Sequence, residues 1–172
     1  MALTLIKETG AGLANANAYA DVADGDAYHD GHLYATAWTG ATADNKAAAL
    51  VMASRLLDAE YQFGGLRTVM TQALQWPRMD CSSPDDDEPL AEDVIPKALV
   101  QATCELAREL LIADRTAAPA GEGLSYQNNG SVQTGYNKAD TRPIIPAVVQ
   151  ALLAKYGALL KARSGSVKLV RV

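Results

Sequence analysis

Residues 96–111 read PKALVQATCELARELL, and this stretch decides the predicted fold. Pro96 can open a helix, because the first turn does not need the N–H that proline lacks. Two neighbouring apolar stripes follow at three- and four-residue steps. They are Leu99, Thr103, Leu106 and Leu110, and beside them Val100, Cys104, Ala107 and Leu111. Two adjacent stripes give a broad buried face, so we predict that this segment is the central helix of the domain.

The segment before this helix has more particular residue choices. Residues 72–78 read QALQWPR, inside a long connection (66–95) without a helical pattern. Trp76 has two interpretations: it packs onto the core of its own chain, or it contacts another protein together with Arg78. Trp and Arg are the residue types that dominate protein–protein hot spots. The sequence leaves both interpretations open.

Three further helices are predicted from caps and apolar spacing. Asp21 can cap a helix that runs towards His32. Thr42 begins the next helix, which Gly64 and Gly65 end. Pro146 opens the last one, and its inner face is expected to carry Val149, Leu152, Leu153, Tyr156 and Leu160.

Strand signals lie outside these helices. Asn129-Gly130 is a two-residue hairpin signal, Leu3–Lys7 is a short strand candidate, and the tail Val167–Val172 has strand propensity. The tail can pair with the N-terminal strand or with a neighbouring copy, and the sequence does not decide between them.

The predicted fold is mainly α: a four-helix bundle with a β-hairpin insertion and short terminal strands. It forms a single domain over 1–172, with a helical core at about 20–163, a hairpin insertion at 119–141 and a C-terminal arm at 164–172.

Charge is unevenly distributed along the chain. The net charge is −5, yet seven acids and no Lys or Arg lie between Met79 and Ile95, and seven basic residues follow from Lys138 onwards against Asp140 alone. Such asymmetry favours acid-to-base contacts between copies or partners, although a solvated loop explains it equally well. A pI near 4.9 argues against phosphate-driven nucleic-acid binding. No apolar stretch is long enough to span a membrane.

No catalytic, cofactor or metal site is predicted. His29 and His32 are one helical turn apart, but no further ligands follow at zinc-site spacing. The acidic run at 85–88 lacks the alternating acids and central glycine of a calcium loop. Cys81 and Cys104 have no C-x-x-C spacing, and Cys104 falls on an apolar helix face, so we expect a buried thiol there. Without a nucleophile–base pair, we predict that the protein is not an enzyme.

Several runs along the whole chain resemble one known family. They are NAYAD at 17–21, DAY at 26–28, ASRLLD at 53–58, QALQWPR at 72–78, PKA at 96–98, ATCELA at 102–107 and SVKLV at 166–170. They resemble the head–tail connector, or adaptor, proteins of tailed phages, whose members often carry the label "DnaT-like single-stranded DNA-binding protein". QALQWPR is the distinctive run among them.

The resemblance implies a structural virion protein at the head–tail interface, made in the host cytoplasm. Its implied partners are further copies of itself in a ring, usually of twelve, with the portal protein on one side and a stopper or tail protein on the other. DNA would pass through the channel of the ring without sequence-specific binding. The alternative is a DnaT-like accessory protein that binds single-stranded DNA.

Candidate interface residues follow from these expectations. They lie in the signature, the hairpin and the tail: Arg78, Tyr126, Asn129, Tyr136, Leu169, Val170 and Arg171. Added strands gain main-chain hydrogen bonds with a neighbour, which is why the hairpin and the tail are included.

Overall fold

The computed structural model describes residues 3–83, 88–118, 126–130, 132–135 and 142–160. Within these ranges the chain forms five helices and three small antiparallel sheets of two strands each. The helices are α1 (Val22–His29), α2 (Thr36–Thr39), α3 (Ala43–Glu60), α4 (Lys97–Ile112) and α5 (Ala147–Leu153). The strands are β1 (Tyr61–Phe63), β2 (Leu66–Arg67), β3 (Arg78–Met79), β4 (Tyr126–Asn129), β5 (Val132–Gly135) and β6 (Gly157–Leu159).

Helix α4 is the centre of the fold, as predicted. It packs against α1, α2, α3 and α5, and Pro96 precedes its first residue. Thr103, Cys104 and Leu106 are fully buried, which confirms the two apolar stripes. Glu105 and Arg108 are buried as well. At about 100° per residue they lie outside both stripes, so the burial of α4 extends beyond the face that the stripes predict.

The starts of α1 and α3 follow their predicted caps. The Asp21 side chain accepts a hydrogen bond from the Asp24 N–H, and the Asp24 side chain accepts one from the Asp21 N–H. Thr42 Oγ1 likewise accepts from the Asn45 N–H. These bonds satisfy backbone donors that a first helical turn leaves free.

The ends of α3 and α5 differ from the prediction, for one shared reason. Tyr61–Phe63 leaves the helix and pairs with Gly157–Leu159 as the antiparallel sheet β1–β6. Helix α3 therefore stops before Gly64, and α5 is shorter than the apolar spacing up to Leu160 suggested. Gly157 makes this pairing feasible, because a Cβ there would lie 2.6 Å from the carbonyl oxygen of Gln62.

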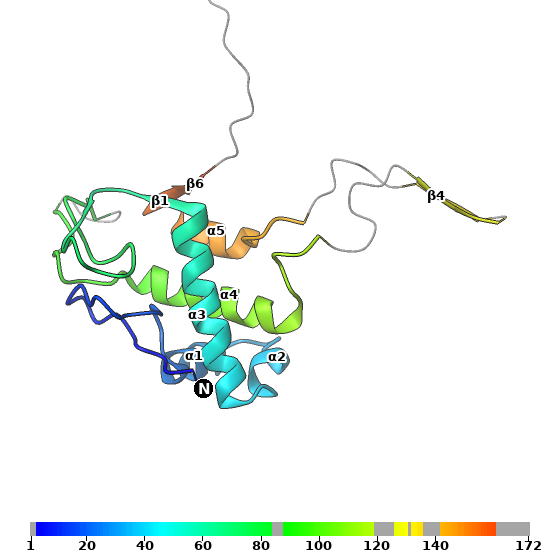
Figure 1. The fold of residues 1–172 in the computed structure, drawn as a ribbon, viewed down its shortest axis with the longest axis horizontal. Coiled ribbons are helices and arrows are strands. Elements are labelled where there is room, and N and C mark those ends of the chain that lie inside the picture. The colour runs from blue at the N-terminus through cyan, green and yellow to red at the C-terminus, as the bar shows by residue number, and fades with distance from the viewer. Residues whose placement is uncertain (1–2, 84–87, 119–125, 131, 136–141, 161–172) are drawn as a thin grey trace, which may run out of the picture.

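The mainly helical expectation holds only in a coarser form, a mixture of helices with small antiparallel sheets. The finer expectation of a four-helix bundle is not met: α2 has a single turn, and α3 crosses α4 steeply instead of lying alongside it (Figure 1). At the N-terminal side, Lys7 forms an isolated bridge with Ala18. The predicted strand Leu3–Lys7 was therefore wrong, since the described residues place no ladder there.

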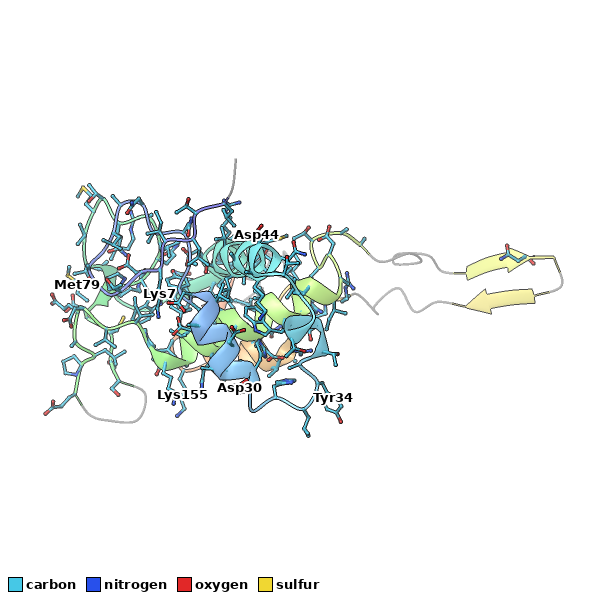
Figure 2. All side chains as sticks on the ribbon, turned by 90° about the horizontal axis from the view of Figure 1, so that it is seen from below. Lys7, Asp30, Tyr34, Asp44, Met79 and Lys155 are labelled. Atoms are coloured by element: carbon cyan, nitrogen blue, oxygen red, sulfur yellow. The ribbon has the colours of Figure 1, made fainter. Side chains whose placement is uncertain are left out.

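The predicted hairpin is present as β4–β5 and projects from the helical body (Figures 1 and 2). Asn129 pairs with Val132, so Asn129 is the last residue of β4, and Gly130 has a φ of 65°.

The predicted tail strand Val167–Val172 lies outside the described residues. No described helix is both long and apolar enough to cross a membrane.

A candidate nucleic-acid groove between α1 and α4

A groove of about 740 Å³ runs between α1 and the N-terminal half of α4. Its described lining is mixed apolar and polar: Asp24, Ala27, Tyr28, Gly31, His32, Ile95, Lys97, Val100, Gln101 and Cys104. Residues of α1 and α4 reach the same groove because Gly25 lets α1 approach the core closely. A Cβ at Gly25 would lie 2.3 Å from the Trp38 ring.

A row of rings follows one edge of the groove. Its ring centroids are separated by 5.0 Å between Tyr28 and His29, 5.8 Å between His29 and His32, and 6.5 Å between His32 and Tyr34. Tyr34 is 76% exposed, and Figure 2 shows it at the edge of the body, pointing away from it. Tyr34 is not part of the groove lining, but its ring contacts His32, which is, edge to face. An exposed ring of this kind can stack on a nucleobase.

The loop that carries Tyr34 is anchored at both ends. Trp38 Nε1 donates a hydrogen bond of 2.8 Å to the Asp26 carboxylate, and Lys46 Nζ lies 2.6 Å from the same oxygen. The Tyr34 N–H donates to His32 Nδ1 over 3.0 Å. The first two contacts hold α1, α2 and α3 together, so Tyr34 is presented by a short loop between braced helices.

The base of the groove is a buried polar network. His29 Nε2 donates to the carbonyl oxygen of Cys104, so Nδ1 is an acceptor, and it has no hydrogen-bond partner among the described residues. Burial lowers the pKa of His29, which keeps the ring neutral near pH 7. Glu105 Oε2 and Arg108 Nε are also buried and lack a hydrogen bond within the described part of the chain. Glu105 Oε2 also lies 3.7 Å from His32 Nε2, which leaves His29 Nδ1 and Arg108 Nε as the unpaired polar atoms behind the groove in the described part of the chain.

Most carboxylates around the groove are neutralised by a basic partner. Asp24 lies 2.5 Å from Lys7 Nζ, and Glu105 lies 2.6 Å from the Arg108 guanidinium. Burial opposes the charge of Arg108, but the neighbouring carboxylates outweigh it and raise its pKa. Lys97 is exposed on the groove and has no ion pair among the residues that the structure describes. The groove therefore presents one cation that is free to meet a phosphate.

The groove offers binding chemistry and no evident nucleophile. Burial raises the pKa of the Cys104 thiol to about 12, so it remains protonated at neutral pH and is unreactive. Burial, followed by the charge of Glu105, raises the pKa of Tyr28, so its phenol stays a neutral donor. Within the described ranges, no group of His, Cys, Asp and Glu is arranged to hold a metal ion.

Arg78 and Asn129, the two fully described residues of the sequence-predicted interface, do not line the groove. Arg78 is buried, and its guanidinium donates to the carbonyl oxygens of Gly64 and Gly65 and to Gln75. Asn129 is exposed on the hairpin, which Figure 2 shows projecting on the side of the body away from Met79. Tyr126 is in β4, but its side chain is outside the described part. Tyr136, Leu169, Val170 and Arg171 are outside the described residues altogether. The role of all seven residues in protein contacts stays a prediction.

Trp76 follows the first of its two interpretations. It is 1% exposed and packs edge-to-face against Phe63 and Tyr156. The QALQWPR segment is therefore built into the core of its own chain: Gln72 is buried as well, and its side-chain N–H groups donate to the carbonyl oxygens of Leu74 and Pro77.

Sequence reasoning missed Tyr28, Tyr34, Lys97 and Gln101. It considered His29 and His32 for metal binding only. One signal was available: four rings within seven residues (28–34) in a polar segment. The aromatic spacing did not reveal that these rings meet the first turns of α4, because that contact is made between segments far apart in the chain.

The exposed Tyr34 ring in contact with the groove residue His32, together with Lys97 in the lining, makes this groove a candidate site for single-stranded nucleic acid. Residues 3–172 match a family described as "Putative DnaT-like ssDNA binding protein". Since the match covers nearly the whole chain, the protein belongs to this family. No curated protein and no solved structure shows significant similarity to it.

This match corrects the expected function. The head–tail adaptor function was wrong as the main expectation, because the matched family is described by single-stranded DNA binding. The alternative, a DnaT-like single-stranded DNA-binding protein, agrees with the match. Self-association of the chain stays a prediction.

Proposed function

We propose that the protein binds single-stranded DNA in the α1–α4 groove. The observation that carries this proposal is the exposed ring of Tyr34, which contacts the groove residue His32 edge to face. Family membership supplies the class of ligand, and the groove supplies the contacts.

Base stacking is expected to dominate the binding. An aromatic ring adds about 1–3 kcal/mol per stacked base, whatever the base, because every base has a π face. The apolar lining of the groove, for example Ile95 and Val100, suits the faces of bases that have left the duplex stack. Gln101 adds an amide that can both donate to and accept from a base.

Phosphate contacts are expected to be few. Lys97 is the free cation of the described lining, and the net charge of −5 opposes long-range attraction of DNA. Binding should therefore be modest in affinity, tolerant of sequence and only weakly dependent on salt. This pattern also reconciles an acidic protein with a DNA ligand.

The test is fluorescence anisotropy of labelled oligothymidine with three variants. Tyr34→Ala should weaken binding about tenfold or more, and Lys97→Ala should weaken it less. Arg55→Ala is the matched control, because Arg55 is an exposed cation on α3 that does not line the groove. If all three variants bind like the parent protein, the groove is not the site.

A further inference from the structure

The imidazole of His32 connects the α1–α4 groove with the loop that carries Tyr34. His32 lines the groove, and its side chain is 25% exposed. Its Nδ1 accepts a hydrogen bond of 3.0 Å from the Tyr34 N–H. Its Nε2 lies 3.7 Å from Oε2 of Glu105 on α4. One ring nitrogen therefore holds the α1–α2 loop, and the other faces the central helix.

The two ring nitrogens of His32 have different roles that the hydrogen bond determines. A backbone N–H can only donate, so Nδ1 is unprotonated in this arrangement and the ring proton is on Nε2. The contact between Nε2 and Glu105 is too long for a hydrogen bond, and Glu105 Oε2 makes none within the described part of the chain. A second proton on the ring must therefore bind to Nδ1, the atom that holds the Tyr34 N–H.

We propose that protonation of His32 releases the Tyr34 loop and so regulates the groove. This inference rests on the proposed single-stranded DNA binding. An imidazolium donates from both nitrogens and accepts at neither, so the hydrogen bond from the Tyr34 N–H is lost when Nδ1 takes up a proton. The positive charge is at the same time attracted to Glu105. Histidine is the side chain whose charge ordinarily changes between about pH 5 and 8, so the release responds to mild acidification.

The groups around His32 determine how readily it takes up this proton. Helix α2 carries no titratable side chain. Besides Tyr34, the titratable and charged groups nearby are Asp24, Tyr28 and His29 on α1 and Lys97, Cys104, Glu105 and Arg108 on α4. Among the described residues, Glu105 is the one within ion-pair distance, and it favours the imidazolium, whereas Lys97 and Arg108 oppose it. Because Glu105 balances the added charge, protonation adds little attraction for a phosphate.

The experiment follows the Tyr34 amide signal in ¹H–¹⁵N correlation spectra of the full chain without DNA, from about pH 7.5 to about pH 5.5. The signal should move upfield, with the same midpoint as the ring signals of His32. His32→Asn is the matched control, because its side-chain oxygen can accept from the Tyr34 N–H and takes up no proton. The Tyr34 signal of His32→Asn should therefore stay in place. His32→Ala offers no acceptor, so its Tyr34 signal should have the acidic position at both pH values.

A Tyr34 amide signal that does not follow the titration of His32, or that moves equally in His32→Asn, overturns the inference. With DNA, the affinity of the wild-type protein for oligothymidine should fall about threefold between the two pH values, which corresponds to the loss of one hydrogen bond that orders the loop. The affinity of His32→Asn should change less over the same range. Equal changes in the two proteins would contradict regulation through His32.

The amide and DNA measurements separate this inference from the proposed function. If the Tyr34 amide follows His32 while Tyr34→Ala binds oligothymidine like the parent protein, the groove proposal fails and the release of the loop stands. If Tyr34→Ala weakens binding while the Tyr34 amide of the wild-type protein ignores His32, the groove proposal stands and the release of the loop is refuted.

Discussion

The phenol of Tyr19 donates a hydrogen bond to the carboxylate of Asp58 and accepts one from the backbone N–H of Trp76. The second oxygen of Asp58 accepts from the Gln75 N–H over 3.0 Å. These bonds join the segment before α1, helix α3 and the QALQWPR segment in one buried unit. Burial raises the pKa of Tyr19 well above its usual value, and the charge of Asp58 adds to this, so the phenol remains a donor.

Asp58 should make folding stability depend on pH. Burial raises its pKa from 3.8 to about 6, so the folded protein binds this proton more tightly than the unfolded chain. The contribution of Asp58 to the free energy of unfolding is therefore largest below about pH 4 and is lost as the pH rises to about 6. The full change is about 3 kcal/mol.

Asp58→Asn isolates this effect. Carboxylates with a lowered pKa, such as Asp26 beside Lys46 and Trp38, contribute in the opposite direction. The measurement is therefore the difference in urea unfolding free energy between wild type and variant at pH 4.5, 5.5 and 7. We expect the variant to become more stable relative to wild type as the pH rises. A difference in unfolding free energy that is constant with pH would contradict the assignment.

Gly25→Ala should destabilise the protein by about 1–3 kcal/mol. Its added methyl would lie 2.3 Å from the Trp38 ring, which is fully buried. The matched control is Gly31→Ala, because nothing lies within 4 Å of a Cβ at Gly31. Thermal unfolding should separate the two variants clearly, and equal midpoints would mean that α1 is not held against Trp38.

Arg78→Lys should also destabilise the fold, by about 3 kcal/mol. The guanidinium donates to Gly64 O at 2.5 Å, Gly65 O at 2.7 Å and Gln75 Oε1 at 3.0 Å. A lysine ammonium cannot reach acceptors spread around a planar fork. Chemical denaturation measures the loss, and Arg55→Lys on the surface of α3 provides the reference. An unchanged free energy of unfolding in Arg78→Lys would indicate that these hydrogen bonds contribute little to stability.

Salt dependence tests the electrostatic part of the groove proposal. Lys97 is the free cation of the described lining. A plot of the logarithm of the oligothymidine binding constant against the logarithm of salt concentration should therefore have a slope of about −0.7 to −1.4, which corresponds to contacts with one or two phosphates. Lys97→Ala should reduce the magnitude of that slope by about 0.7. A slope several times steeper would require a basic surface other than this groove.

Local signals predicted much of the fold, and long-range pairing explains most of what they missed. Pro96 and the two apolar stripes gave α4 correctly, and Asp21 and Thr42 gave the starts of two helices. Helix α3 ends where it does because Tyr61–Phe63 pairs with Gly157–Leu159. The sequence of neither segment indicates which segment it pairs with. Apolar spacing continues through Tyr156 and Leu160, so it favoured a longer helix.

The candidate site was harder to predict than the core. A buried face leaves a periodic pattern in the sequence, but an exposed ring such as Tyr34 leaves none. His29 and His32 resembled part of a metal site at the level of spacing, whereas in the folded chain His29 donates to Cys104 and His32 accepts from Tyr34. Their neighbours in space, more than their spacing, determine what they do.

The bracing of the α1–α2 loop by Asp26, Trp38 and Lys46 has a consequence for how quickly a strand would leave. A loop already fixed by folding loses little conformational freedom when a base stacks on Tyr34. Asp26→Ala removes the contacts to Trp38 and Lys46. It should therefore shorten the residence time of the complex with single-stranded DNA, even though Asp26 is not expected to touch a nucleotide.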